Sequence, residues 1–163
     1  MKVKKTVAFD IDGTLFYTTR KILEDSIEVE INSQKRYLKI RPNIEFLFEY
    51  LDLNKDFFEI IIYSAATNEY IETLLNFVDK KHLIQKIYDR EYCDKNIVDG
   101  KMTFIKNYKK IKEDLHNLYL IDDNETHFDN LDIIGYKCHK FKGNIDDYEI
   151  FNIIEFLETL KIV

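Results

Sequence analysis

The chain has 163 residues, of which 45% are apolar, and its 24 basic and 30 acidic residues give a formal net charge of −6. Two cysteines are too few for a disulfide scaffold, no apolar run reaches the ~18 residues of a membrane span, and the acidic total argues against a protein that coats nucleic acid. We therefore expect an intracellular domain, cytoplasmic or nuclear, with a buried core, no membrane segment and no direct nucleic-acid binding.

The predicted elements of the first half alternate between strand and helix. Residues 6–9 form an apolar run with β-branched side chains, which indicates a buried strand. Residues 28–40 contain two alternating stretches around a polar turn and predict a hairpin. Pro42 suits the first turn of a helix, and apolar residues follow it at helical spacing. Residues 57–63 predict a second buried strand, and residues 71–78 a second helix.

The second half is less regular at first and then returns to the same alternation. Residues 79–103 are irregular with short extended pieces, and residues 108–115 have a helical pattern. Residues 118–121 predict a third buried strand, and residues 136–141 a fourth. A last helix begins at Asp146-x-x-Glu149, which has the spacing of a capping box.

This alternation predicts an α/β fold, namely a Rossmann-like parallel sheet with helices on both faces and small hairpin elements near the site. No repeat, low-complexity tract or linker divides the sequence. We therefore expect one domain over residues 1–163, with an insertion at about residues 79–104, and a monomer.

Acidic and hydroxyl side chains follow the predicted buried strands. Asp10 and Asp12 follow the first, Ser64 follows the second, and Asp122 and Asp123 end the third. Because the carboxyl ends of parallel strands meet at one edge, these side chains are expected to converge there. A hard cation such as Mg²⁺ would offset the repulsion among the carboxylates. Taken singly, a strand-end aspartate is more often a helix cap or a solvated turn, and a lone serine an N-cap.

Four motifs in order resemble the haloacid dehalogenase superfamily of phosphotransferases. They are DIDGT at residues 10–14, Ser64, Lys106 and the acidic pair at residues 122–123. Arg41-Pro42, YSAA at residues 63–66 and YDREYC at residues 88–93 give a finer resemblance to the RNA polymerase II C-terminal-domain phosphatases. Gly13, Ser64 and Asn107 stand where that family usually has Glu, Thr and Asp.

The resemblance implies a Mg²⁺-dependent phosphatase that forms a phosphoaspartyl intermediate. Asp10 would be the nucleophile, Asp12 the general acid and base, and Ser64 and Lys106 would bind the transferring oxygens. The expected metal ligands are Asp10, the backbone oxygen of Asp12, Asp122 and Asp123. Other residues expected near the substrate are Thr14, Val29, Ile31, Ala65, Tyr70 and Arg90.

The expected partner is a protein or peptide that carries phosphoserine or phosphothreonine. Residues 80–112 hold ten basic and four acidic residues, a net charge of +6, and a positive field there would attract an acidic substrate. Lysines on an ordinary solvated face explain the same charge equally well. Two alternatives stay open, namely a phosphatase for a small phosphorylated metabolite or a nucleic-acid end, and a peptide-binding module without turnover.

Overall fold

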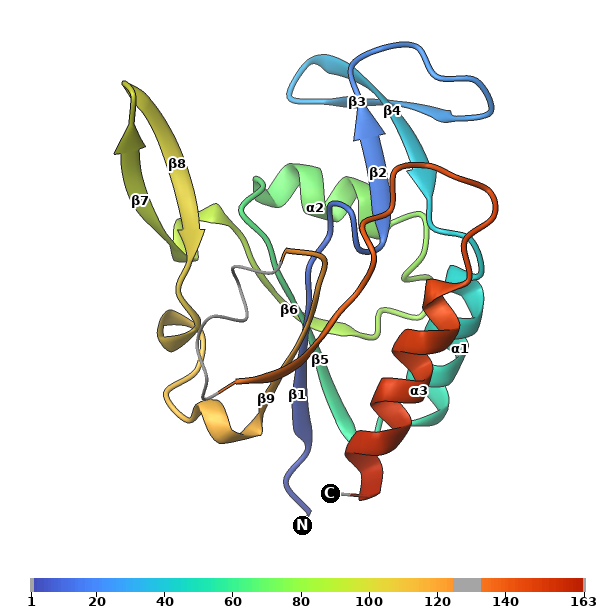
Figure 1. Cartoon of the computed structure of the whole chain (residues 1–163), viewed down its shortest axis with the longest axis vertical. Helices are drawn as coiled ribbons and strands as arrows, with labels where there is room; N and C mark the ends of the chain where they lie inside the picture. Colours follow the sequence, from blue (N-terminus) through green and yellow to red (C-terminus); the bar gives the residue numbers. More distant parts are fainter. Residues whose placement is uncertain (1, 125–132, 163) are drawn as a thin grey trace.

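The computed structural model describes residues 2–124 and 133–162, and a five-stranded parallel sheet forms its centre (Figure 1). The strand order is β10-β9-β1-β5-β6, and every neighbouring pair runs parallel. The strands are β1 (Lys5–Phe9), β5 (Phe58–Tyr63), β6 (Ile84–Tyr88), β9 (Leu118–Asp122) and β10 (Ile134–Lys137). The predicted α/β fold is confirmed, although β10 lies earlier than the predicted strand at residues 136–141.

Helices of two kinds cover the two faces of this sheet. The α-helices α1 (Ile44–Leu53), α2 (Asn68–Leu75) and α3 (Glu149–Ile162) bury apolar residues in one core with Val7, Phe9 and Ile62. The opposite face, which includes Ala8 and Ile61, packs against residues of the short 3₁₀ helices η2 (Tyr108–Lys110) and η3 (Leu115–Asn117). Within residues 2–124 and 133–162, no helix combines the length and apolarity that a membrane crossing requires.

Two small antiparallel sheets stand at the carboxyl end of the parallel strands (Figure 1). One is a three-stranded sheet with the order β2-β4-β3, formed by β2 (Phe16–Thr19), β3 (Ile27–Ile31) and β4 (Gln34–Ile40). The hairpin prediction for residues 28–40 is therefore confirmed, and β2 adds a strand that the sequence does not predict. The other is the hairpin of β7 (Cys93–Val98) and β8 (Lys101–Lys106).

Residues 79–103 are more regular than the sequence predicts. They contain β6, which extends the central sheet, and the β7–β8 hairpin. Asp99 and Gly100 close this hairpin with φ values of 51° and 73°, as tight two-residue hairpin turns require. After Cys93, every residue of β7 is exposed. A strand without a buried face leaves no alternating apolar pattern, which explains why the sequence predicts only short extended pieces here.

The predicted helix at residues 108–115 is wrong. Two separate 3₁₀ turns occupy this segment instead. The side chains of Asn107 and Asp114 accept hydrogen bonds from the backbone amides of Lys109 (3.2 Å) and His116 (3.0 Å), so each begins a new turn. Such local side-chain bonds compete with a continuous helix.

The predicted capping box at the start of α3 is also wrong, by one residue. Asp147 rather than Asp146 accepts the hydrogen bond from the backbone amide of Glu149, at 3.2 Å. The buried carboxylate of Glu149 points to the preceding segment, where it accepts hydrogen bonds from the backbone amide of His139 (3.1 Å) and the hydroxyl of Tyr136. Glu149 therefore ties the helix to the sheet.

Candidate active site

The loop that follows β1 carries the first group of candidate residues. The Asp10 amide donates to the carbonyl of Ile121 on β9 at 2.9 Å, which continues the sheet beyond Phe9. The chain then turns at Gly13, where φ is +79°. A Cβ atom at this position would lie 2.4 Å from Oδ2 of Asp123, so the glycine allows the loop to approach the acidic end of β9.

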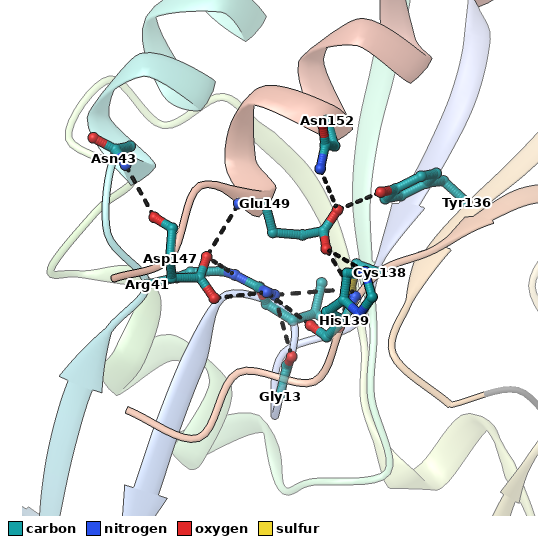
Figure 2. A network of polar contacts seen from close by, with 10 residues as sticks. Gly13, Arg41, Asn43, Tyr136, Cys138, His139, Asp147, Glu149 and Asn152 are labelled. Carbon is teal, nitrogen blue, oxygen red and sulfur yellow. Dashed lines mark hydrogen bonds and ion pairs between the residues drawn. The ribbon is translucent and has the colours of Figure 1, made fainter. Parts of the chain in front are cut away.

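The buried side chain of Arg41 supports this loop from behind (Figure 2). Its Nη1 donates to the carbonyl of Thr14 at 3.0 Å and to that of Gly13 at 3.4 Å, and its Nη2 donates to the carbonyl of His139 at 2.7 Å. Nε and Nη2 also contact the two carboxylate oxygens of Asp147 at 2.8 and 3.1 Å. One guanidinium thus fixes the loop after β1 to the segment between β10 and α3.

Three carboxylates meet at the carboxyl edge of the sheet. Oxygen atoms of Asp10, Asp122 and Asp123 all lie within 4.8 Å of one another. The hydroxyl of the buried Thr14 lies 3.4 Å from Oδ2 of Asp10 and 3.2 Å from Oδ1 of Asp123, and thereby connects the loop to the end of β9. The convergence expected from the strand ends is therefore present.

Lys106 projects into the same cluster from the end of β8. Its Nζ lies 2.9 Å from Oδ1 of Asp10 and 2.7 Å from Oδ2 of Asp122, and only 3% of its side chain is exposed. Burial alone would lower the pKa of Lys106, but the two carboxylates outweigh it and raise that pKa. Burial raises the pKa of Asp10 well above its ordinary value, and the charge of Lys106 opposes this rise. Lys106 is thus the side chain that most favours an ionised Asp10.

Asp12 has a different environment, at the wall of the cleft. Its Oδ1 accepts a short hydrogen bond from the hydroxyl of Tyr70 on α2, and that hydroxyl also lies 2.6 Å from Oγ1 of Thr18 on β2. The surrounding walls desolvate the Asp12 carboxylate and raise its pKa, while the hydrogen bond from Tyr70 opposes the rise. A carboxyl group with a raised pKa, fixed by a neighbour and accessible to substrate, suits proton transfer.

Ser64 and Arg90 border the cluster from the next strands of the sheet. Ser64 is buried directly after β5, and its Oγ accepts a hydrogen bond from the amide of Ala66 at 3.1 Å. Arg90 lies just after β6, and its Nε donates to the carbonyl of Ala65 at 3.2 Å while its guanidinium stacks over Phe104 at 4.7 Å. The segments after β5 and β6 therefore present polar groups to the same carboxyl edge of the sheet.

A cleft of about 800 Å³ opens over these groups. The candidate residues that line it are Asp10, Asp12, Ile31, Ser64, Ala65, Tyr70, Arg90 and Lys106. Thr14 does not line the cleft, because it is fully buried, but its hydroxyl lies beside Asp10, which does. Val29 is buried in the core. The structure also adds Arg20, Arg36 and Lys140, which sequence reasoning missed. Alternation along β4 could have identified Arg36, because it shares a face with Leu38.

The basic segment at residues 80–112 does not form one positive face at the cleft. Of its ten basic residues, only Arg90 and Lys106 line the cleft. Lys81 instead pairs with Asp52 on α1 at 2.6 Å, and Lys110 pairs with Asp94 on the outer hairpin at 2.7 Å. The charge of this segment is therefore spread over several surfaces.

The carboxylate cluster has the donor chemistry that Mg²⁺ prefers. Asp10, after β1, and Asp122 and Asp123, at the end of β9, offer hard oxygen ligands within 4.8 Å of one another. The Asp12 side chain is directed to Tyr70, so its backbone oxygen stays the expected contribution from that residue. The described residues thus fit a divalent hard cation beside the Asp10 carboxylate.

The parallel sheet with acidic side chains at its carboxyl edge agrees with the haloacid dehalogenase superfamily that the four motifs predict. A sequence model of the NLI interacting factor-like phosphatase family matches residues 5–163. The chain belongs to this family, which confirms the finer resemblance to the C-terminal-domain phosphatases.

Similar proteins come from a yeast, from Dictyostelium and from human. Phosphatase PSR1 of Saccharomyces cerevisiae is 26% identical over 166 residues, which cover 99% of this chain and 37% of that protein. CTD small phosphatase-like protein 2 of Dictyostelium discoideum is 28% identical over 162 residues, or 96% of this chain and 27% of that protein. The human carboxy-terminal domain RNA polymerase II polypeptide A small phosphatase 1 is 24% identical over 167 residues, which cover 97% of this chain and 60% of that protein.

The solved structure of Fcp1, an essential RNA polymerase II CTD phosphatase, has the same fold. It superimposes with a TM-score of 0.63 at 20% identity, covering 98% of this chain and 49% of that one. This chain therefore spans about half of the Fcp1 chain, and less than two thirds of each of the three relatives.

Proposed function

We propose that this domain is a Mg²⁺-dependent phosphatase that hydrolyses phosphoserine and phosphothreonine in proteins through a phosphoaspartyl intermediate. The position of Asp10 carries the proposal. Its carboxylate lies at the floor of an open cleft, within hydrogen-bond distance of Lys106 and beside the two acidic residues that end β9. A buried carboxylate held by a lysine, next to a second carboxyl group at Asp12, is an arrangement suited to nucleophilic catalysis.

In the first step, the Asp10 carboxylate attacks phosphorus and displaces the serine or threonine oxygen of the substrate. Asp12 gives its proton to this leaving oxygen, which avoids expulsion of an alkoxide. The raised pKa of Asp12 favours the protonated form that this role requires, and the hydrogen bond from Tyr70 holds the carboxyl group in position. The Lys106 ammonium and the Ser64 hydroxyl bind the transferring phosphoryl oxygens.

In the second step, a water molecule attacks the phosphoryl group on Asp10. Asp12, now deprotonated, accepts a proton from this water, and the bond between phosphorus and the Asp10 oxygen breaks. Inorganic phosphate leaves, Asp10 regains its carboxylate and Asp12 its proton. When bound at Asp10, Asp122 and Asp123, Mg²⁺ supplies positive charge that offsets the repulsion between nucleophile and phosphate.

The preference for protein substrates rests on the openness of the site and on the relatives. The cleft of about 800 Å³ extends from Lys106 along the three-stranded sheet, which leaves room for a peptide beside a phosphorylated side chain. Fcp1 and the human small phosphatase are named for action on the C-terminal domain of RNA polymerase II. We place the activity inside the cell, in the cytoplasm or nucleus, which suits two buried free cysteines, Cys93 and Cys138.

The test compares three panels of substrates on the wild-type chain with Mg²⁺, using phosphate release as the measurement. The panels are phosphoserine and phosphothreonine peptides, small phosphorylated metabolites, and oligonucleotides with terminal phosphates. We expect the peptides to have the highest kcat/KM and EDTA to stop turnover. A higher kcat/KM for a metabolite or a nucleic-acid end would overturn the protein substrate. Peptide binding without turnover would identify a binding module instead.

A further inference from the structure

All four arginines of the chain lie at or directly behind the cleft. The chain has 20 lysines but only four arginines, so lysine is its ordinary surface cation. Arg20, Arg36 and Arg90 line the cleft, and Arg41 supports the loop beneath it. A guanidinium differs from an ammonium in its planar fork of donors, which matches phosphate and carboxylate oxygens in pairs. The arginines are thus placed where anion recognition would need them.

Arg36 occupies an unusual position on β4. It pairs with Val29 across the antiparallel register, so the two side chains share one face of the three-stranded sheet. Val29, Leu38 and Ile31 on this face are buried, and Arg36 stands among them as a partly buried cation that lines the cleft. An arginine on an apolar sheet face is costly unless a partner satisfies it.

The described residues do not satisfy every donor of the Arg36 guanidinium. Its Nε is buried and has no hydrogen-bond partner among the described residues. The charge of Arg36 lowers the pKa of Asp12, but only as a minor influence, behind burial and the hydrogen bond from Tyr70. With the Nε donor unused and its side chain in the cleft lining, Arg36 keeps donor capacity for a ligand.

Arg20 extends the same positive region. It follows the last residue of β2, next to the register pair of Thr19 and Tyr37, and it is exposed to the cleft. Thr18, two residues earlier, lies 2.6 Å from the hydroxyl of Tyr70. Tyr70 therefore joins two regions of one cleft, the catalytic carboxylates on one side and the three-stranded sheet with its two arginines on the other.

We propose that Arg20 and Arg36 form a second anion-binding subsite, which takes a phosphate or carboxylate that the substrate peptide carries besides the phosphate being hydrolysed. This inference rests on the proposed function, because it assigns the substrate class of the same cleft. The phosphate under attack is held by Ser64 and Lys106, so it does not use these two arginines. The preferred substrate is thus an acidic or multiply phosphorylated phosphopeptide.

The test uses peptides with one phosphoserine and otherwise neutral residues, and variants in which glutamate or a second phosphoserine replaces each flanking residue in turn. The measurement is kcat/KM for each peptide relative to the neutral one, at low salt, with wild type, Arg36→Gln and Arg20→Gln. The matched control is Lys35→Gln. Lys35 is the neighbour of Arg36 on β4, but its side chain is 71% exposed and outside the cleft.

For wild type, we expect a second anion at the best flanking position to raise kcat/KM by about 10- to 100-fold, as one charge-assisted contact allows. Arg36→Gln and Arg20→Gln should each reduce this ratio at least several-fold, and Lys35→Gln should keep it. Added salt should lower the ratio in wild type. Arg20 is exposed, so its variant stays informative if Arg36→Gln fails to fold.

Three results would overturn the subsite. They are a wild-type ratio near one at every flanking position, a ratio unchanged in both arginine variants, and a preference for a small bisphosphorylated metabolite over every peptide. Failure of the proposed function looks different, since wild type would then hydrolyse neither p-nitrophenyl phosphate nor any peptide. In that case the subsite is tested by binding alone, because Asp10→Asn should still bind the acidic peptides more tightly than the neutral one.

Discussion

Replacing Arg41 with methionine removes a buried guanidinium while keeping most of the side-chain volume. The change leaves the Asp147 carboxylate, which is only 10% exposed, without its paired donors. It also removes the donors that hold the carbonyls of Gly13, Thr14 and His139 (Figure 2). We therefore expect both a loss of stability and a less ordered loop after β1.

The size of this loss follows from the burial of the pair. Removing one partner of a buried, hydrogen-bonded ion pair costs about 3–5 kcal/mol. A domain of this size has a free energy of unfolding of roughly 5–15 kcal/mol, so Arg41→Met is expected to fold with a reduced margin. Each kcal/mol lowers Tm by about 2–4 °C at this length, which gives a decrease of about 6–20 °C.

Urea denaturation followed by circular dichroism measures the free energy of unfolding of wild type, Arg41→Met, Asp147→Leu and the double variant. The double variant should be less destabilised than the sum of the single changes, because it leaves no unpaired buried charge. Lys35→Met serves as the control, since its exposed pair with Glu28 at 3.7 Å should contribute less than about 1 kcal/mol. A loss below about 1 kcal/mol for Arg41→Met, or additive single losses, would refute this reasoning.

Three further predictions concern the cleft. Thr14→Val removes a buried hydroxyl that lies beside two carboxylates of the cluster. The affinity for Mg²⁺, measured by activation of turnover, should fall about 10- to 100-fold. Unchanged activation would mean that Thr14 does not position the metal ligands. Tyr70→Phe removes the donor to Asp12, so kcat should fall about tenfold or more, and an unaltered kcat would mean that this contact does not position the acid. Mg²⁺ should raise the Tm of wild type in a concentration-dependent way, and an equal rise in Asp122→Asn would argue against the carboxylate cluster as its site.

Much of the fold follows from local patterns in the sequence. The buried strands β1, β5 and β9 are short apolar runs. Asp10 and Ser64 directly follow β1 and β5, Asp122 ends β9, and the sheet brings all three to one edge. Asp10 and Asp122 lie 112 positions apart in the chain, yet the parallel pairing of β1 and β9 makes them neighbours. This part of the site was predictable because parallel strands end at the same edge.

The remaining features depend on contacts that no local pattern encodes. The β7–β8 hairpin has no buried face beyond its base, and residues 108–115 bend because Asn107 and Asp114 bond to nearby amides. Arg36 on β4 and Arg20 after β2 line the cleft where the three-stranded sheet packs beside α2, a contact between segments far apart in the chain. The net positive charge of residues 80–112 could be counted from the sequence, but not where each basic side chain lies. In the structure these side chains are spread over several surfaces.

Acid-quenched intact-protein and peptide mass spectrometry tests the role of Asp10 most directly. Wild-type protein is mixed with Mg²⁺ and a phosphoserine peptide, quenched during turnover and digested. We predict one added phosphoryl group on the fragment that contains Asp10, and neither this adduct nor phosphate release in Asp10→Asn. A phosphoryl group on another residue, or phosphate release by Asp10→Asn at the wild-type rate, would contradict the assignment of Asp10 as the nucleophile.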